Sequence, residues 1–426
     1  MLDKILKIFK IPDLRNKILF ILGIFAIFRL MANIPMPGLE PGMMADFFSR
    51  FEMFQFANLF TGGTLDQFSI VMLGLGPYIT AVIVMQLMTL VFPKLEKMYK
   101  EEGEMGKKKI NQYGRLLTVP FAILQTYGML ALFQREGVVS PLSFMETIVT
   151  ISTVTAGTVF LMWLGELISE KGIGNGVSLL IFAGIVASLP ANVGQMILDI
   201  TVDPTQVQTY LLFFLIGILV IASVVYVNEA RRNIPVSYAR RVRGRKVYGG
   251  SSTYIPLTLN PAGVIPIIFA ISVLALPAMV AGFFIGVEGV VGGVAEMVSV
   301  FLTNPWAQGT LYFLLVVLFT YFYTAVTFDP KNVSKNLQNM GGFVPGIRPG
   351  KSTTNFINYI LNRVLFLGAL FLGTIAVLPS IIAGLTGVAT FGFLIGGASL
   401  LIMVSVVLQT MKQINSQLQM RDYDKI

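Results

Sequence analysis

Side chains that commonly carry out enzymatic chemistry are scarce in this sequence. The chain contains no cysteine and no histidine. Their absence excludes disulfides, thiolate metal sites and iron–sulfur clusters, together with the hydrolytic mechanisms that depend on Ser-His or Cys-His pairs. The histidine ligands that zinc and haem commonly use are absent as well. The sequence therefore predicts a function without a catalytic centre, a metal or a cofactor.

Apolar side chains could still act on a partner, and two pairs of aliphatic residues have a suitable spacing. Leu75 and Ile79 are four residues apart, as are Ile181 and Ile185, and this spacing places each pair on one face of a helix. Branched aliphatic side chains that meet at a constriction exclude ions by dewetting. The same spacing is also typical of ordinary packing between membrane helices, so spacing alone does not identify a pore.

Clustered basic residues could also act on a partner. The segment 231–246 contains seven Lys and Arg residues and no acidic residue, and Arg348 stands alone among the turn-forming residues of GGFVPGIRPGKST. Arginines on a stiff hairpin suit a large anionic partner, because their planar guanidinium groups bind phosphates bidentately. A positive-inside bias with attraction to anionic lipid explains the same cluster without any partner. Both interpretations remain open on physical grounds.

Long apolar segments must position these residues. Of 426 residues, 55% are hydrophobic and only 12% are charged, whereas soluble proteins carry about a quarter. A bilayer core of about 30 Å needs about 20 apolar residues in a helix. Nine segments meet this requirement, and the last is long enough for two helices, so the sequence predicts ten spans. The segments are 17–34, 67–93, 116–134, 147–165, 172–198, 204–228, 247–287, 297–328 and 364–411.

The positions of the basic residues test this count. Cytoplasmic loops of membrane proteins collect Lys and Arg. With the N-terminus inside and ten spans, 27 of the 31 Lys and Arg residues fall in inside segments and two fall outside. The formal net charge of +9 is therefore mostly a consequence of topology. Both chain termini are predicted to be cytoplasmic.

Ten spans divide into an N-terminal half, residues 1–200, and a C-terminal half, residues 201–426. Two five-helix halves of opposite topology would form an inverted repeat with a pathway between them. Within the first half, the segment from Phe60 to Ile79 is too polar for a lipid-facing span and too apolar for a free loop. It predicts a short re-entrant helix that packs inside the protein and leads into a full helix.

Ionisable residues are missing from the cores of the predicted spans. A transporter or proton pump places such residues at mid-membrane, where they are costly and usually functional. This absence disfavours an ion-coupled secondary transporter with inverted repeats, which stays the alternative function. It also disfavours an intramembrane enzyme.

Four strings of this sequence closely resemble the SecY family, the channel subunits of the bacterial Sec protein translocon. They are GGTLDQFSI with Gly76–Thr80, Gly172–Ser178 with Ile181–Ile185, Asn260–Pro266, and Gly342–Gly350. The resemblance is collinear over the whole chain. It implies an all-α polytopic membrane protein with ten transmembrane helices in two inverted five-helix halves around an hourglass pore. It places the protein in the bacterial cytoplasmic (inner) membrane.

The implied function is a protein-conducting channel, not an enzyme, that moves unfolded secretory polypeptides across the membrane and releases membrane segments sideways into lipid. The resemblance implies the small subunits SecE and SecG, the SecA motor ATPase, the ribosome, signal sequences and unfolded precursors as partners. The implied pore ring is Leu75, Ile79, Ile181, Ile185, Ile268 and Ile402. The implied plug, within about 57–69, is Asn58, Leu59, Phe60, Thr61, Gly62, Gly63, Thr64, Leu65, Asp66, Gln67 and Phe68.

The resemblance also implies a lateral gate made of the second, third, seventh and eighth spans. Its polar candidates are Thr80, Gln86, Gln125 and Asn260, although interhelical hydrogen bonding explains these residues equally well. The two large cytoplasmic loops, about 229–261 and 329–356, would dock the motor or the ribosome. The implied docking residues are Arg240, Arg241, Arg243, Arg245, Lys246 and Arg348.

Overall fold

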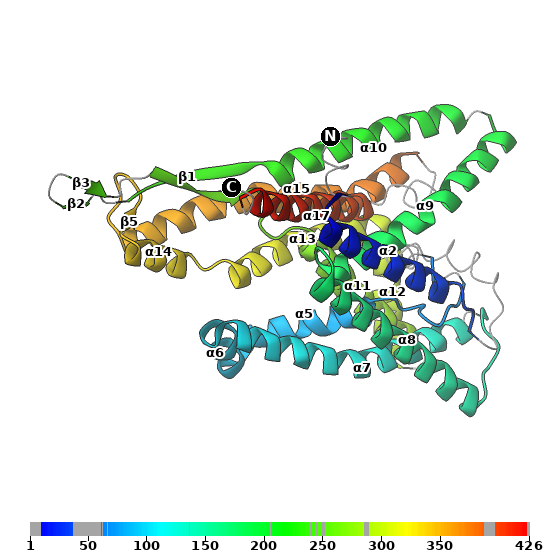
Figure 1. The fold of residues 1–426 in the computed structure, drawn as a ribbon. Coiled ribbons are helices and arrows are strands. Elements are labelled where there is room, and N and C mark those ends of the chain that lie inside the picture. The colour runs from blue at the N-terminus through cyan, green and yellow to red at the C-terminus, as the bar shows by residue number, and fades with distance from the viewer. Residues whose placement is uncertain are drawn as a thin grey trace.

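The structure of the protein is a computed structural model, in which helices run roughly along one axis and a small sheet projects at one end (Figure 1). The residues that it describes are 10–36, 61, 63–65, 67–135, 137–204, 206–238, 241–243, 246–248, 252–284, 289–386 and 397–423.

One helix lies at each of the ten predicted spans, in the predicted order. These helices are α2 (Pro12–Ala32), α5 (Gly76–Val91), α7 (Gly103–Arg135), α8 (Phe144–Lys171), α9 (Gly176–Val202), α10 (Gln206–Glu229), α11 (Ile265–Phe284), α13 (Pro305–Thr327), α15 (Lys351–Thr386) and α17 (Gly397–Tyr423). The predicted all-α polytopic membrane architecture is confirmed.

Six helices of the described part of the chain are long and apolar enough to cross a membrane. The pair formed by α5 and the short helix α6 (Pro93–Glu101), bent by 108°, makes a seventh if it counts as one span. Among the other three, α2 carries Asp13, Arg15 and Lys17 in its first turns, and the second half of α17 is polar. The third, α11, carries no charge, and its apolar stretch Ile265–Leu274 is shorter than a span over the described residues.

Side-chain caps and prolines define where several helices begin. Ser143 and Glu146 form a reciprocal capping box at the start of α8. Asn175 caps α9, and Asn304 caps α13 directly before a proline. Each cap accepts a hydrogen bond from a backbone N–H that has no partner within its helix. These polar residues, which stand between the apolar segments, fix the helix boundaries.

Shorter elements lie between the spans. They are the helices α12 (Val290–Thr303) and α14 (Pro330–Asn339) and the strands β1 (Arg231–Tyr238), β2 (Arg241–Arg243), β3 (Lys246–Tyr248), β4 (Ser252–Thr258) and β5 (Gly342–Phe343). Strand β1 pairs antiparallel with β4 and also with β5, whereas β2 and β3 form a separate ribbon. The sequence predicted a stiff hairpin here, and β5 from the second loop extends it to a three-stranded sheet.

The helices pack in two groups that meet along two seams. In the first group α5 packs on α7, α7 on α8 and α8 on α9, while α2 packs on α8 and α9; α10, α11, α13, α15 and α17 form the second group. Along one seam α11 packs against α5 and α7, and along the other α9 packs against α10 and α17. The largest hydrophobic cluster, which we call the central cluster, contains residues from both groups.

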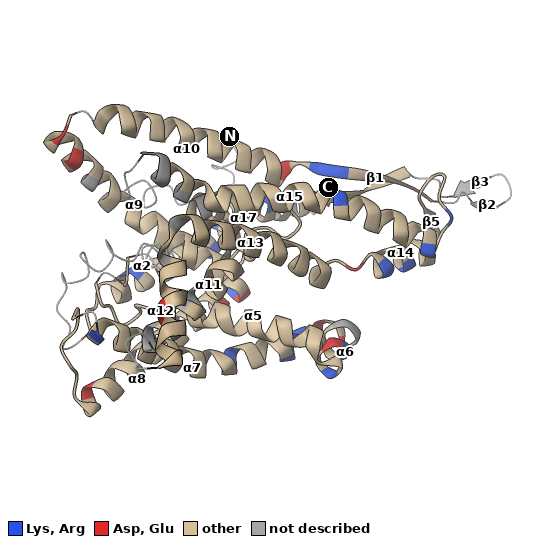
Figure 2. Cartoon of the chain, turned by 180° about the vertical axis from the view of Figure 1, so that it is seen from behind, with Lys and Arg blue, Asp and Glu red and all other residues tan. Residues whose placement is uncertain are grey.

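Charged residues gather mainly at one end of the molecule. Figure 2 shows Lys and Arg at the end that carries α6, α14 and strand β1, whereas the opposite end carries few of them. This asymmetry agrees with the distribution of basic residues along the sequence.

The segment before α5 differs from its predicted form. Residues 63–65 and 67–75 form bends and turns with a β-bridge at Ser69, whereas Thr61 is helical and the residues directly before it lie outside the described ones. Glycines with positive φ at Gly63 (78°) and Gly74 (54°) favour turns, because a side chain is strained in this backbone conformation. The segment is nevertheless mostly buried and leads directly into α5, as predicted.

Candidate functional site

Six aliphatic side chains from four different parts of the chain belong to the central cluster. Leu75, Ile181, Ile185 and Ile402 are buried members, and Ile79 and Ile268 pack against it while partly exposed. They come from the start of α5, the first half of α9, the first turn of α11 and the second turn of α17. All six residues of the implied pore ring therefore belong to the same large hydrophobic cluster.

The paired spacing within this set corresponds to one helical face. The backbone N–H of Ile79 donates to the carbonyl of Leu75 at 3.0 Å, so the two side chains are one turn apart. Ile181 and Ile185 are likewise one turn apart on α9, and their exposed fractions are 4% and 2%. Ile402 is fully buried. Such a cluster presents no hydrogen-bonding side chain to water, which is the condition for a dewetted constriction.

The turn segment before α5 covers one side of the α7–α8 helix pair. Leu65 and Phe68 are buried in a second hydrophobic cluster with Met129 and Phe133 of α7 and Val154 of α8. The ring of Phe68 meets that of Phe133 edge-on, with 5.5 Å between centroids. This geometry is the favoured one for an aromatic pair. The described residues of the implied plug are therefore fixed against the first half of the protein.

Backbone contacts hold the same segment in place. Ser69 bridges to Pro35, Met36 N–H donates to the Phe68 carbonyl at 2.8 Å, and Ile70 N–H donates to the Ile34 carbonyl at 3.1 Å. These contacts join the end of α2 to the start of α5. They occur immediately beside the residues that pack on α7.

Two glycines permit this close packing. A Cβ on Gly157 of α8 would overlap the carbonyl oxygen of Ile70, and one on Gly74 would lie 3.1 Å from a methyl group of Thr61. The hydroxyl of Thr64 donates to backbone carbonyls, among them that of Val71 at 3.2 Å. Sequence reasoning missed Gly157, because nothing in its local sequence indicates which segment packs against it. Asn58, Leu59, Phe60, Gly62 and Asp66 of the implied plug lie outside the described residues.

The four polar gate candidates do not form one group. Gln125 of α7 donates through Nε2 to the hydroxyl of Thr80 on α5 at 3.3 Å, and the Thr80 hydroxyl donates to the Gly76 carbonyl at 3.0 Å. Both side chains are buried. The side-chain oxygen of Gln86 is buried, with no hydrogen-bond partner among the described residues. The Thr80–Gln125 contact is an interhelical hydrogen bond within the first group of helices.

Asn260 belongs to a different network. Its Nδ2 donates to Asn228 Oδ1 and to the Gly263 carbonyl, both at 3.1 Å, and Asn228 Nδ2 donates to Ser405 Oγ at 3.0 Å. This network joins the end of α10, the turn before α11, and α17. It fixes the entry to α11, the helix that packs against α5 and α7. Asn228 and Ser405 were not among the residues singled out from the sequence.

The basic hairpin and the loop with Arg348 form one unit. A small hydrophobic cluster lies beneath both, and it consists of Ile234, Val236, Leu257, Leu337, Val344 and Ile357. The Ser334 hydroxyl donates to the Gly350 carbonyl at 2.9 Å, and the Thr353 hydroxyl donates to the Arg348 carbonyl at 2.9 Å. The backbone on both sides of Arg348 is therefore held by α14 and α15.

Arg348 itself is exposed on this fixed loop. No ion pair involves it within the part of the chain that the structure describes. Arg241, Arg243 and Lys246 lie in the β2–β3 ribbon, and Arg240 and Arg245 lie outside the described residues. A guanidinium that is presented in this way is available to an anionic partner.

Metal chemistry has no counterpart in the described residues. Over the described ranges, no group of three or more His, Cys, Asp or Glu side chains could hold a metal ion. The arrangement that remains is an aliphatic cluster between two groups of helices, a buried segment on one side and a basic surface at one end.

Comparison with known proteins agrees with this arrangement. The SecY family model matches residues 69–411. A curated relative, protein translocase subunit SecY of Streptomyces scabiei, is 42% identical over 100% of this chain and 99% of its own length.

Solved structures share the fold. One, described as the structure of a protein conducting channel, has a TM-score of 0.65 at 19% identity and covers 93% of this chain and 91% of its own. Another, which concerns the plug domain of the SecY protein, has a TM-score of 0.63 at 20% identity over 92% and 90%. The resemblance seen in the sequence is therefore confirmed, and the chain belongs to the SecY family of protein translocase subunits.

Proposed function

We propose that this chain is a protein-conducting channel that moves unfolded secretory polypeptides across the bacterial cytoplasmic membrane. Its family consists of translocase subunits, and its fold is that of a multi-pass membrane protein. The observation that carries the proposal is that one apolar cluster between the two groups of helices includes Leu75, Ile79, Ile181, Ile185, Ile268 and Ile402. A secondary transporter, the alternative kept from the sequence, has no support in the structure or in the family.

The aliphatic cluster is the seal of the channel. Both groups of helices contribute to it, so a small separation of the groups would open a path between their side chains. Aliphatic side chains make only weak, non-directional contacts with each other, and they part at lower cost than a hydrogen-bonded network would. Water and ions stay out while the side chains touch, and a bulky, flexible chain passes when they part.

The turn segment before α5 is the inner part of the plug. It precedes Leu75 directly, so its position is coupled to that of the seal. Its contacts are with α7, α8 and the end of α2, all in the first half. The plug therefore belongs structurally to residues 1–200, and residues 201–426 form the half that moves relative to it.

The seam between α11 and the α5–α7 pair is the lateral gate, which α13 flanks through its packing on α11. Opening there would expose a translocating segment to lipid. Thr80 and Gln125 tie the first-half side of the seam together, and Asn260 anchors the entry to α11. These polar residues stabilise each side of the gate and do not form a bond across it.

Partners supply the energy, and the chain itself is not an enzyme. The fixed loop with exposed Arg348 and the adjacent basic hairpin dock the SecA motor or the ribosome. Small membrane subunits of the SecE and SecG type complete the complex. The end that carries α6, α14 and strand β1 faces the cytoplasm, because Lys and Arg gather there (Figure 2). Both termini lie on that side.

A crosslinking experiment tests the proposal. A photoreactive residue at position 79 or 268 should crosslink to a precursor polypeptide that is arrested halfway through the membrane. The matched control is position 215 on α10, where Leu215 is 58% exposed on the outer surface. If the arrested precursor crosslinks to position 215 and to neither seal position, the polypeptide follows another path and the proposal is wrong.

A further inference from the structure

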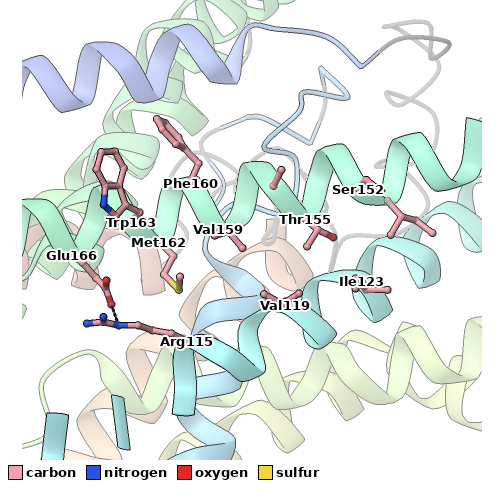
Figure 3. A pocket seen from close by; sticks show the side chains of 12 residues that line it. Arg115, Val119, Ile123, Ser152, Thr155, Val159, Phe160, Met162, Trp163 and Glu166 are labelled. Atoms are coloured by element: carbon pink, nitrogen blue, oxygen red, sulfur yellow. Dashed lines mark ion pairs between the residues drawn. The ribbon is translucent and has the colours of Figure 1, made fainter. Parts of the chain in front are cut away.

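A groove on the surface of the bundle runs between α7 and α8 (Figure 3). It has a volume of about 830 Å³ and is open along one side. Its walls are mostly apolar, with Val119 and Ile123 on the α7 side and Val159, Phe160 and Met162 on the α8 side. The described function of the chain does not use this groove.

An ion pair closes one end of the groove. Arg115 Nε contacts Glu166 Oε1, and the two Nη atoms of the guanidinium extend beyond this contact (Figure 3). Arg115 directly precedes the charge-free stretch 116–134, and Glu166 directly follows the charge-free stretch 147–165. Both charges therefore lie where the apolar core of the membrane ends and the lipid headgroups begin.

Trp163 lies at the same membrane depth as the ion pair. Its side chain lies one turn from Glu166, lines the groove and is 51% exposed. Its ring lies 5.7 Å from that of Phe160. Tryptophan is enriched at the membrane–water interface, where its ring is apolar and its N–H can reach polar groups. The ion pair and the indole together define a headgroup position at this end of the groove.

The groove is longer than one leaflet is thick. It extends along α8 from Ile151 to Glu166. The 15 steps from residue 151 to residue 166 correspond to about 22 Å of helix at a rise of about 1.5 Å per residue. One leaflet contributes about 15 Å to the hydrocarbon core. A single acyl chain can therefore lie along the groove with its headgroup beside the ion pair.

The charges select the headgroup. A guanidinium with free Nη groups offers donors to a phosphate, and the adjacent carboxylate accepts from an ammonium. A purely anionic headgroup would meet the carboxylate of Glu166 without a counter-charge. A quaternary ammonium has no N–H to donate. The complementary headgroup has a phosphate and a primary ammonium a few atoms apart.

We propose that this groove is a binding site for phosphatidylethanolamine. One acyl chain lies between α7 and α8, the phosphate binds Arg115 and the ammonium binds Glu166. The site rests on the membrane placement of the chain but not on its channel activity. A bound lipid would stabilise the packing of α7 on α8, and the buried turn segment lies against both helices.

The two tryptophans of the chain permit a direct test. The full-length W306F variant, reconstituted in vesicles, retains Trp163 at the groove, and the matched W163F variant retains Trp306 at the start of α13. Lipids brominated on their acyl chains quench nearby tryptophan fluorescence. Brominated phosphatidylethanolamine should quench Trp163 at about threefold lower mole fraction than brominated phosphatidylcholine, the effect of one exposed ion pair. Trp306 should show no such preference.

Three outcomes would overturn the site. Equal quenching of Trp163 by both lipids would indicate bulk lipid only. The absence of quenching by either lipid would show that protein covers the groove. A preference that persists in the E166Q, W306F variant would remove the proposed ammonium partner. The comparison of lipids on W306F alone needs no change at the ion pair, so it decides the question even if E166Q fails to fold. Loss of channel activity would not alter these results, so the two proposals fail separately.

Discussion

Gly157 provides a sharp test of how the segment before α5 is held. It lies in the middle of α8, where an added Cβ would overlap the carbonyl oxygen of Ile70 and lie 3.1 Å from a methyl group of Val71. Gly23, in the middle of α2, has nothing within 4 Å of the same position. Alanine in a helix interior is ordinarily more stable than glycine by about 1 kcal/mol. The two glycines should therefore respond in opposite ways to the same substitution.

The size of the difference follows from the overlap. The neighbour at Gly157 is a backbone atom, which cannot rotate away as a side chain can, so the helix or the segment must move. Overpacking of this kind costs about 1–3 kcal/mol, which offsets or exceeds the gain of about 1 kcal/mol from helix propensity. We expect G23A to raise the free energy of unfolding by about 1 kcal/mol and G157A to leave it about 1–3 kcal/mol below that of G23A.

Two assays measure the consequences. Denaturant or thermal unfolding in detergent gives the stability difference, and the ion current of resting channels in planar bilayers reports the seal. Ile70 lies between the bridge at Ser69 and Leu75, a residue of the proposed seal, so a displaced Ile70 should raise the current in G157A and not in G23A. If G157A gains as much stability as G23A and its resting ion current does not rise, the proposed contact between α8 and this segment is wrong.

Three further substitutions test the seal, the docking loop and the gate. I79N places a polar side chain at the seal, so it should raise the resting ion current and relax discrimination against precursors with defective signal sequences, as an export assay would show. R348E should abolish SecA-driven export into vesicles while membrane insertion survives, and K331E on exposed α14 is its control. T80V should cost about 1–3 kcal/mol in unfolding because it leaves the buried Gln125 amide without its acceptor, whereas Q125L should cost about 1 kcal/mol or less because Thr80 keeps its bond to the backbone.

The positions of the spans could be predicted from the sequence because bilayer thickness and charge act locally. The charge-free stretch 204–228 matches α10, which begins at Gln206 and ends at Glu229. Each apolar stretch can be recognised without any knowledge of its neighbours. The same is true of the caps, since Asn175 and Asn304 lie next to the helices that they cap.

Contacts between distant segments could not be predicted in this way. Asn228 and Ser405 are 177 residues apart, and neither has a local feature that indicates the other. The pairing of β5 with β1 likewise joins two loops that are separated by three helices. The set of six aliphatic residues came from the family resemblance. Spacing along the sequence links Leu75 with Ile79 and Ile181 with Ile185, but it does not link these two pairs to each other or to Ile268 and Ile402. Long-range packing depends on the whole fold, whereas periodicity and hydropathy report only local structure.

The three-stranded sheet gives the proposed docking end a direct mechanical connection to α11. Leu259 follows β4, and its backbone N–H donates to the Ala230 carbonyl at 2.9 Å. Its own carbonyl packs closely against Gly368 of α15. Helix α11 begins shortly afterwards, at Ile265. Strand β5, close to Arg348, is paired with β1, which is paired in turn with β4. A force applied by a motor at Arg348 would thus be transmitted through hydrogen-bonded strands to α11, the helix that borders the proposed lateral gate. Inserting flexible glycines between β4 and α11 should break this connection. The motor would then still bind, but its force would no longer move α11.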